Sequence, residues 1–332
     1  MIRTNSNETA LQDVSFGEAR RKNELWEFIE NYAIEHEGLI DPLFNSMFIR
    51  LFGKEESRQL TQNLINAILR AADLGEIDAI EEITSETSAI GGSIECRTTR
   101  FDVLVTSENR IIDLEAQCYP DSIDNRSLMY ASKLLTSFTK KGVEYDDIPQ
   151  VIVITLLNAT PIFPQTDDFL HVSQMQWRSQ NHSEPGTDRA LFVLVELEKI
   201  RSRYTELSNE VLGDNLLSWL YLLTTGFRSR QEFETIVDKF PTLEEFAARY
   251  GYALDDPKLS IAYDEFDFAV REEKRRQKYL DRLKREGLEE GLAEGRAEGR
   301  AEGRSEAQQE MILRLQELGV DGAIIAKLAV EQ

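Results

Sequence analysis

The alternation of hydrophobic and polar residues divides the chain into helical and strand-like stretches. In the N-terminal part, apolar residues recur at intervals of three and four over residues 25–33, 43–52 and 56–71, which is the pattern of helices with one buried face. Residues 1–22 are polar and show no periodicity, so we expect a loose lead-in there. Three helices are therefore expected after this lead-in.

The second of these helices carries clear start and stop signals. Asp41 stands at the N-cap position, Pro42 at the first helical position, and Gly53 directly after the last apolar residue. Asp accepts hydrogen bonds from the free N–H groups of a first turn, Pro has no N–H to leave unsatisfied, and Gly ends helices. These signals predict a helix between Asp41 and Gly53.

Beyond Gly75 the period changes to that of strands. Strand-like stretches are expected at 79–84, 99–106 and 110–118, a helix at 126–141, and two further strands at 150–157 and 190–197. The last two, QVIVITLL and ALFVLVEL, are continuous apolar runs of the kind that sheets bury on both faces. We therefore expect an α/β core with a mixed sheet that ends near residue 200.

The region after the sheet, residues 205–285, has a helical pattern throughout. Its end, residues 271–285, holds eight Lys or Arg against three Asp or Glu. Such a run is usually the solvated face of a helix, and contact with nucleic-acid phosphates is the other interpretation.

A low-complexity repeat follows, with glycine at every fourth position from Gly287 to Gly303. Each glycine inside a helix costs about 1 kcal/mol relative to alanine, and like charges stack beside the glycine column. An antiparallel partner helix would relieve both defects, because glycine permits close approach and Glu columns would face Arg columns. We expect either self-association through residues 286–332, with a small helical cap at 307–330, or a flexible acidic linker.

Length and charge narrow the class of protein. A chain of 332 residues is long enough for about two domains. Its 38 Lys and Arg against 60 Asp and Glu give a formal charge of −22, which excludes a general basic coat for nucleic acid but allows a local basic surface. The sequence has neither a membrane-spanning apolar stretch nor the apolar centre of a secretion signal. We therefore expect a cytoplasmic protein with no membrane partner.

The most informative stretch for chemistry is TRFDVLVTSENRIIDLEAQC, residues 99–118. If Glu108 and Asn109 form a two-residue turn, Asp102 lies directly opposite Glu115 on one face of a hairpin. Their Cβ atoms would be about 5 Å apart. Two such carboxylates repel each other unless a positive group, most simply a divalent cation, lies between them.

Alternation along the second strand places more polar residues on the same face. Asp113 and Gln117 fall on the side of Glu115. A slip of one residue would separate Asp102 from Glu115, so the inference depends on the turn. The alternative is an exposed sheet face whose acidic residues point to water.

The residues around this hairpin carry no net charge, although the chain as a whole is acidic. Residues 95–141 contain seven Lys or Arg and seven Asp or Glu, so they form either a local phosphate-binding surface or ordinary surface charge. Other chemistries lack support: the three histidines have no metal-ligand spacing, and there is no Walker-type loop and no nucleophile elbow.

Several of these segments, taken together, resemble a known family. They are DPLFNSMFIRLFG, LTQNLINAIL, FDVLV, LEAQ, RSLMYASKLL and KKGVEYDDIPQVIVITLLN, followed by the EG-rich repeat. In this order the chain resembles the recombination-promoting nuclease/putative transposase family of the PD-(D/E)XK nuclease superfamily. The resemblance implies a restriction-endonuclease-like fold, in which helices flank a mixed sheet, and a metal-dependent DNA endonuclease activity.

The resemblance also implies roles for four residues. Asp102 looks like the first metal carboxylate and Glu115 like the second. Gln117 stands where the superfamily motif often has lysine, and the E-x-Q form is usual in this family. Asp41 is similar to the acidic residue of the first core helix.

DNA contacts are expected from two regions. On the helix after the hairpin, Arg126 and Tyr130 match polar positions of the family, and Lys133 adds a positive charge. In the basic run, Arg275 and Arg276 are the candidates.

These inferences together predict a Mg²⁺- or Mn²⁺-dependent DNA endonuclease associated with transposition or recombination, with DNA as partner and self-association through its C-terminal helix. Asn45 stands where the family often has lysine, which favours the alternative, a catalytically inactive protein of this fold that serves as a DNA- or protein-interaction module. We expect four parts. Residues 1–38 form a lead-in and helix, and residues 39–200 form a nuclease-like core. Residues 201–285 form a helical region, and residues 286–332 form an EG-repeat helix with its cap.

Overall fold

The structure is a computed structural model that describes residues 19–36, 38–88, 100–120, 122–139, 142–226 and 228–264, with 303, 307, 309–314, 318 and 319 further on. The chain forms two compact units, Met1–Tyr263 and Asp264–Gln332. The expected basic run at 271–285, most of the EG repeat, and Arg275 and Arg276 lie outside the described residues. Self-association and the four-part division of the chain stay predictions.

The first unit is built on a six-stranded mixed sheet in the order β1-β2-β3-β4-β8-β5. These strands are β1 (Glu82–Ser88), β2 (Arg100–Ser107), β3 (Arg110–Gln117), β4 (Gln150–Leu157), β5 (Leu170–Gln174) and β8 (Ala190–Glu196). β3, β4 and β8 run parallel, whereas β1–β2, β2–β3 and β5–β8 are antiparallel pairs. A two-stranded ribbon, β6 (Gln176–Arg178) and β7 (Ser183–Pro185), lies between β5 and β8 in the chain.

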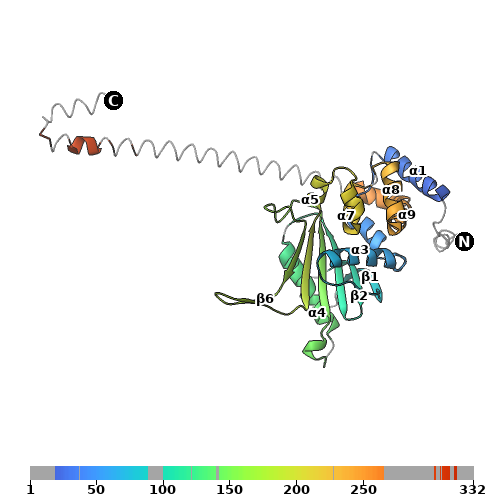
Figure 1. Cartoon of the computed structure of the whole chain (residues 1–332), viewed down its shortest axis with the longest axis horizontal. Coiled ribbons are helices and arrows are strands. Elements are labelled where there is room, and N and C mark those ends of the chain that lie inside the picture. Colours follow the sequence, from blue (N-terminus) through green and yellow to red (C-terminus); the bar gives the residue numbers. More distant parts are fainter. Residues whose placement is uncertain are drawn as a thin grey trace. The chain divides into compact units, whose positions relative to one another are not determined.

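Helices flank this sheet (Figure 1). They are α1 (Ala19–Glu35), α2 (Asn45–Phe52), α3 (Arg58–Ala71), α4 (Ile123–Phe138), α5 (Leu197–Arg203), α6 (Asn209–Gly213), α7 (Asn215–Thr225), α8 (Arg230–Lys239) and α9 (Pro241–Leu254). The sheet and its helices confirm the predicted class, a mixed α/β fold consistent with that of restriction endonucleases.

The two faces of the sheet have different partners. α4 packs against β4 through a core that includes Ala131, Leu134, Val151 and Val153. The opposite face is apolar and buried, and α2 and α5 contact β2 and β4. The aromatic rings of Phe52, Trp219 and Phe246, from α2, α7 and α9, meet at centroid distances of 5.5 to 6.2 Å. α4 therefore lies over the face of the sheet that carries the polar residues of β3.

Four predicted elements lie close to their observed positions. β2, β3, β4 and β8 agree with the expected strands within a residue at each end. α4 begins and ends three residues earlier than predicted, at Ile123 and Phe138. The strand expected at 79–84 is β1 at Glu82–Ser88, because α3 side chains hold the backbone that precedes it: Asn66 bonds both the N–H and the carbonyl of Ile77.

The prediction for the start of the second helix is wrong. Asp41 caps a turn instead: its side chain accepts from the N–H of Leu43 at 2.8 Å and its carbonyl accepts from the N–H of Phe44. α2 therefore begins at Asn45, with Phe44 as N-cap. Asp side chains compete in this way with helix formation by bonding nearby backbone N–H groups. Gly53 ends the helix as expected.

No helix among the described residues is long and apolar enough to cross a membrane.

Candidate active site

The β2–β3 hairpin has the predicted register. Glu108 and Asn109 form its two-residue turn, with Glu108 in the left-handed region at φ 47°. Ser107 pairs with Arg110, and the pairs continue to Val103 and Leu114. One step further, Asp102 lies opposite Glu115, as the turn predicts.

At this end of the hairpin, hydrogen bonds from backbone N–H groups to side chains take the place of backbone-to-backbone bonds. Glu115 Oε1 accepts from the backbone N–H of Asp102 at 3.1 Å. In return, Asp102 Oδ2 accepts from the backbone N–H of Ala116 at 3.1 Å. These reciprocal bonds fix both carboxylates at the point where the two strands separate.

The acidic side chains on the two strands of the hairpin are buried, so the alternative of an exposed acidic face is wrong. Asp102 is 8% exposed, Glu115 2% and Asp113 0%, because α4 covers this face of the sheet. Neither carboxyl oxygen of Asp113 has a hydrogen-bond partner of good geometry among the described residues. Buried polar atoms without partners are rare in folded proteins and mark a strained or functional position.

Burial and mutual repulsion make these carboxyl groups weak acids. Burial, and then the charge of Asp102, raise the pKa of Glu115 to about 8. Burial, followed by the charges of Glu115 and Asp102, raises the pKa of Asp113 well above its usual range and favours its protonated form. The cluster therefore stores unfavourable electrostatic energy at neutral pH, which a cation at the site would relieve.

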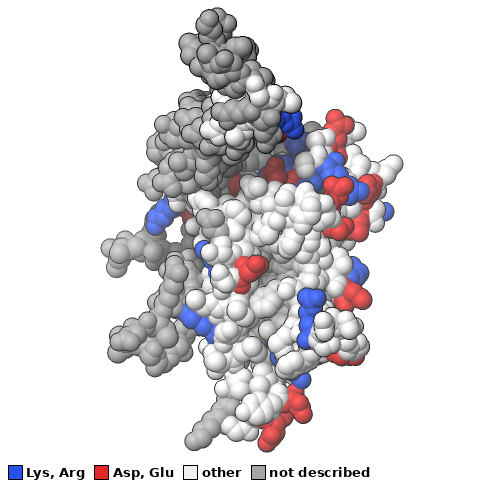
Figure 2. All heavy atoms as spheres, turned by 90° about the vertical axis from the view of Figure 1, so that its left-hand side faces the viewer, with Lys and Arg blue, Asp and Glu red and all other residues white. Residues whose placement is uncertain are grey.

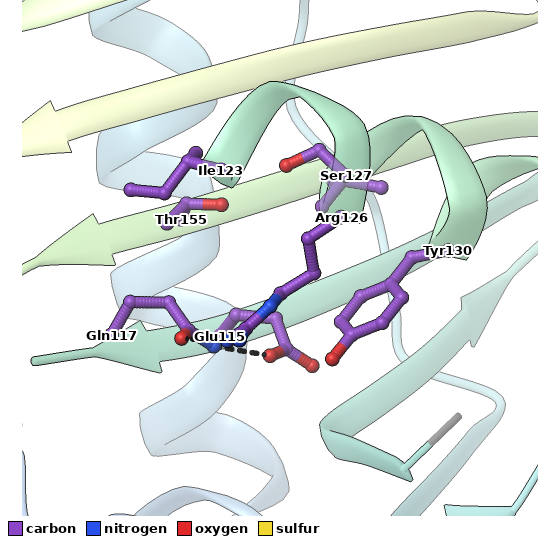
Figure 3. Close-up of a pocket in the computed structure, with 8 residues that line it drawn as sticks. Glu115, Gln117, Ile123, Arg126, Ser127, Tyr130 and Thr155 are labelled. Carbon is purple, nitrogen blue, oxygen red and sulfur yellow. Dashed lines mark hydrogen bonds between the residues drawn. The ribbon is translucent and has the colours of Figure 1, made fainter. Parts of the chain in front are cut away.

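A chain of hydrogen bonds connects α4 to these carboxylates (Figure 3). Arg126 donates from its guanidinium to Oε1 of Gln117, and Gln117 Nε2 donates to Glu115 Oε2 at 2.8 Å. Because Arg126 can only donate, it fixes which end of the Gln117 amide faces Glu115. Sequence reasoning expected Arg126 to contact DNA, whereas here its partner is Gln117.

A small pocket lies between α4 and strands β3 and β4. It has a volume of about 10 Å³, the space of about one water molecule or small ion. Its lining includes every member of the hydrogen-bonded chain and is formed by Glu115, Gln117, Ile123, Arg126, Ser127, Tyr130, Val153 and Thr155. Burial and the charge of Glu115 raise the pKa of Tyr130, so its hydroxyl stays a proton donor beside the carboxylates.

Asp41 lies near the carboxyl ends of the parallel strands. Its Oδ2 accepts from Asn158 Nδ2 at 3.0 Å, and the backbone N–H of Asn158 donates to the carbonyl of Gln117 at 2.8 Å. Arg201 of α5 donates to Oδ1 of the same asparagine at 2.6 Å. Asp41 is therefore linked to the end of β3 through Asn158 and does not line the pocket.

The remaining predicted residues take other positions. Lys133 is half-buried on α4, one turn beyond Tyr130, and is not part of the pocket lining. Asn45 is exposed at the start of α2.

Sequence reasoning missed Thr155 and the burial of Asp113. Thr155 is the only polar residue from Val151 to Leu157, and this isolated hydroxyl in an apolar strand was the available signal. The burial of Asp113 depends on the placement of α4 over the sheet, which local sequence does not show.

The residues present fit a divalent cation. Carboxylate and amide oxygens are hard ligands, and Mg²⁺ is commonly held by one or two carboxylates together with water and substrate phosphates. Within the described residues, no three His, Cys, Asp or Glu side chains form a metal-binding group, so the site offers a pair of carboxylates, Asp102 and Glu115.

The part of the chain that contains this site is similar to a known protein family. The profile of the PD-(D/E)XK nuclease family transposase matches residues 42–287, which include the sheet, α4 and all the residues of the pocket. No curated protein and no solved structure gives a significant match. Because the match covers more than half of the chain, the protein belongs to the PD-(D/E)XK nuclease family transposases.

Proposed function

We propose that this protein is a divalent-metal-dependent DNA endonuclease that acts in transposition or recombination. The observation that carries the proposal is the pair of buried, mutually repelling carboxylates, Asp102 and Glu115, which are held opposite each other, with Glu115 lining a small pocket under α4. A structural role does not explain this pair, because burying two carboxylates without a counter-charge is costly. Nucleases of this superfamily generally use divalent metals.

Asp102 and Glu115 would hold the metal, Mg²⁺ or Mn²⁺. When bound, the metal supplies charge stabilisation at the phosphate and activation of the attacking water. The reciprocal bonds to the backbone N–H groups of Asp102 and Ala116 keep both carboxylates in place before DNA arrives.

Gln117 stands where the superfamily motif often has lysine, so it orients groups without carrying charge. Its Nε2 uses one hydrogen for Glu115 and has a second hydrogen for a water or a phosphate oxygen. Arg126 holds the amide in this orientation. In this proposal Arg126 is a positioning residue that acts through Gln117.

Arg126→Ala is expected to lower kcat about tenfold, because the Gln117 amide is then free to rotate. Single-turnover cleavage rates of Arg126→Ala, Gln117→Ala and the double variant measure this. If Arg126 acts through Gln117, the second substitution adds little to the first. Additive losses, or a loss confined to DNA affinity, would assign Arg126 to direct DNA contact instead.

Mg²⁺ or Mn²⁺ is expected to raise the melting temperature of the protein, because a ligand that binds only the native state stabilises it. At a concentration one hundred times its Kd the gain is about 2.7 kcal/mol. Thermal denaturation of wild type and Glu115→Ala, with each metal and with EDTA, checks this. An equal shift in the variant would place the metal elsewhere.

Cleavage of a supercoiled plasmid tests the activity itself. A closed circle has no ends, so conversion to the nicked or linear form requires an endonuclease. We expect conversion by the wild type with Mg²⁺ or Mn²⁺ and none with EDTA. Absence of cleavage by folded protein with either metal would favour the second candidate, a non-catalytic interaction module, because Asn45 stands where the family often has lysine.

A further inference from the structure

The β6–β7 ribbon is a narrow arm that projects from the sheet (Figure 1). Every residue from Gln174 to Pro185 is exposed. The arm projects from the same side of the sheet as α4, the helix that covers the candidate active site (Figure 1).

This arm has a defined structure. Trp177 pairs with Glu184 across its two strands, and the N–H of Ser179 donates to the carbonyl of His182 at 2.8 Å to close the tip. At its base, Gly186 lies so close to Met175 that a Cβ would be 2.9 Å from the Met175 carbonyl oxygen. The ribbon is therefore built to hold a fixed shape without packing on the body of the protein.

Four of the twelve side chains from Gln174 to Pro185 are amides, and the arm also carries one guanidinium and one indole. By strand alternation, Gln176, Arg178 and Ser183 share one face, and Trp177 lies on the other. Gln180 and Asn181 form the tip. Amide side chains bond adenine edges, and arginine bonds guanine edges, in the major groove of DNA.

The arm is also neutral within a strongly acidic chain. From residue 174 to 185 the only charged residues are Arg178 and Glu184, against −22 for the whole chain. Figure 2 shows the side toward which the arm projects, and most of its described surface is uncharged. A polyanion meets less repulsion here than at the acidic surfaces of the protein.

We propose that the β6–β7 ribbon enters the major groove of duplex DNA, with the Gln176–Arg178 face toward the base edges. A two-stranded ribbon is about 5 Å between strand axes and the groove is about 12 Å wide. The inference rests on the proposed function and adds to it a DNA-reading element separate from the metal carboxylates.

Intrinsic fluorescence and duplex binding test this arm directly. The chain has three tryptophans, of which Trp26 and Trp219 are buried and Trp177 is 70% exposed. A labelled duplex of about 20 base pairs, two helical turns, is titrated into the full chain in EDTA, and anisotropy and tryptophan emission are followed together. Because Trp177 lies on the face opposite Gln176 and Arg178, we expect its emission to stay nearly unchanged as the duplex binds, and strong quenching by the duplex would contradict the proposed orientation.

The double variant Gln176→Ala/Arg178→Ala is expected to bind the duplex about tenfold or more weakly, because each good base contact contributes about 1–3 kcal/mol. Arg230→Ala, which removes one positive charge from an exposed position of α8, is the matched control and should keep wild-type affinity. The side chains of Gln176, Arg178 and Arg230 are all exposed. Both variants should therefore melt at the wild-type temperature, which confirms that they fold. A single strand of the same sequence should bind wild type and double variant equally.

Three results would overturn the inference. One is wild-type duplex affinity in the double variant; the metal site could still cleave DNA in that case, and the proposed function would stand. The second is equal loss of single-strand binding, which would indicate stacking on unpaired bases. The third is a change in the mass of the variant in light scattering, which would assign the arm to self-association. Failure of the proposed function would differ, since wild type itself would neither bind nor cleave DNA.

Discussion

Glu115→Gln is expected to stabilise the metal-free protein at pH 8. Burial and the charge of Asp102 raise the pKa of Glu115 from 4.5 to about 8. The folded state therefore binds a proton that the unfolded state releases, and wild-type stability falls as pH rises from about 4.5 to about 8. The neutral amide of Glu115→Gln removes this loss of stability. We therefore expect its free energy of unfolding to be higher by about 1 kcal/mol or more, and its melting temperature by roughly 2–4 °C.

The pH dependence of that gain distinguishes it from a general packing effect. Denaturation of wild type and variant at pH 5 and pH 8, in EDTA, should give nearly equal stabilities at pH 5 and a separation at pH 8. Glu108→Gln, at the exposed turn of the same hairpin, is the control and should change neither. A less stable Glu115→Gln protein at pH 8 would contradict the idea that the carboxylates repel each other in the folded state.

Glu196→Ala is expected to have the opposite effect, a loss of about 3–5 kcal/mol. The Glu196 side chain is also fully buried, at the end of β8, but it has a complete set of partners. It accepts from the N–H groups of Ile162 and Phe163, from His171 Nε2 at 3.1 Å and from Lys199 Nζ at 2.6 Å. Its removal leaves the ammonium group of Lys199, which is 11% exposed, without its carboxylate.

The contribution of Glu196 to the free energy of unfolding also changes with pH in a defined direction. Burial opposes ionisation of Glu196, but Lys199 and the backbone N–H groups of Phe163 and Ile162 hold its pKa below the usual range. The contribution is therefore present above about pH 4.5 and is lost as pH falls through the lowered pKa. Urea denaturation of wild type and Glu196→Ala at pH 7 measures the loss; a variant as stable as wild type would show that the network contributes little.

Glu196 and Glu115 show how two buried carboxylates of one sheet can differ in their surroundings. Both are buried in parallel strands of the same sheet, Glu196 as the last residue of β8 and Glu115 two residues before the end of β3. Glu196 meets a lysine and backbone donors, whereas Glu115 faces Asp102 and Asp113. The difference lies in the partners and not in burial, which is why the pKa of one is lowered and that of the other raised.

Local sequence predicted the hairpin well because its register depends on a two-residue turn. Once Glu108 and Asn109 form that turn, the pairing of Asp102 with Glu115 follows. The apolar strands β4 and β8 were predicted for a similar reason, since continuous apolar runs have few other arrangements.

Features that depend on tertiary contacts were not predictable. The helix expected after Asp41 begins later because that side chain bonds the N–H of Leu43 and the amide of Asn158, 117 residues away. The strands β5 to β7 are short, and β6 and β7 are polar and exposed, so they lack the alternation that marks a half-buried strand. The hydrogen bond from Arg126 to Gln117 could not be predicted, because the two residues lie on different elements; contact of Arg126 with DNA stays a prediction.

The most direct test of the account compares wild type, Glu115→Gln and Glu108→Gln in cleavage of supercoiled plasmid with Mg²⁺, Mn²⁺ or EDTA. The two variants remove the same charge from opposite ends of one hairpin. We predict metal-dependent cleavage by wild type and Glu108→Gln, and a rate about 10³-fold lower for Glu115→Gln, since metal stabilisation of the transition state amounts to several kcal/mol. Metal-dependent cleavage at the wild-type rate by folded Glu115→Gln would contradict the assignment of the active site to this hairpin.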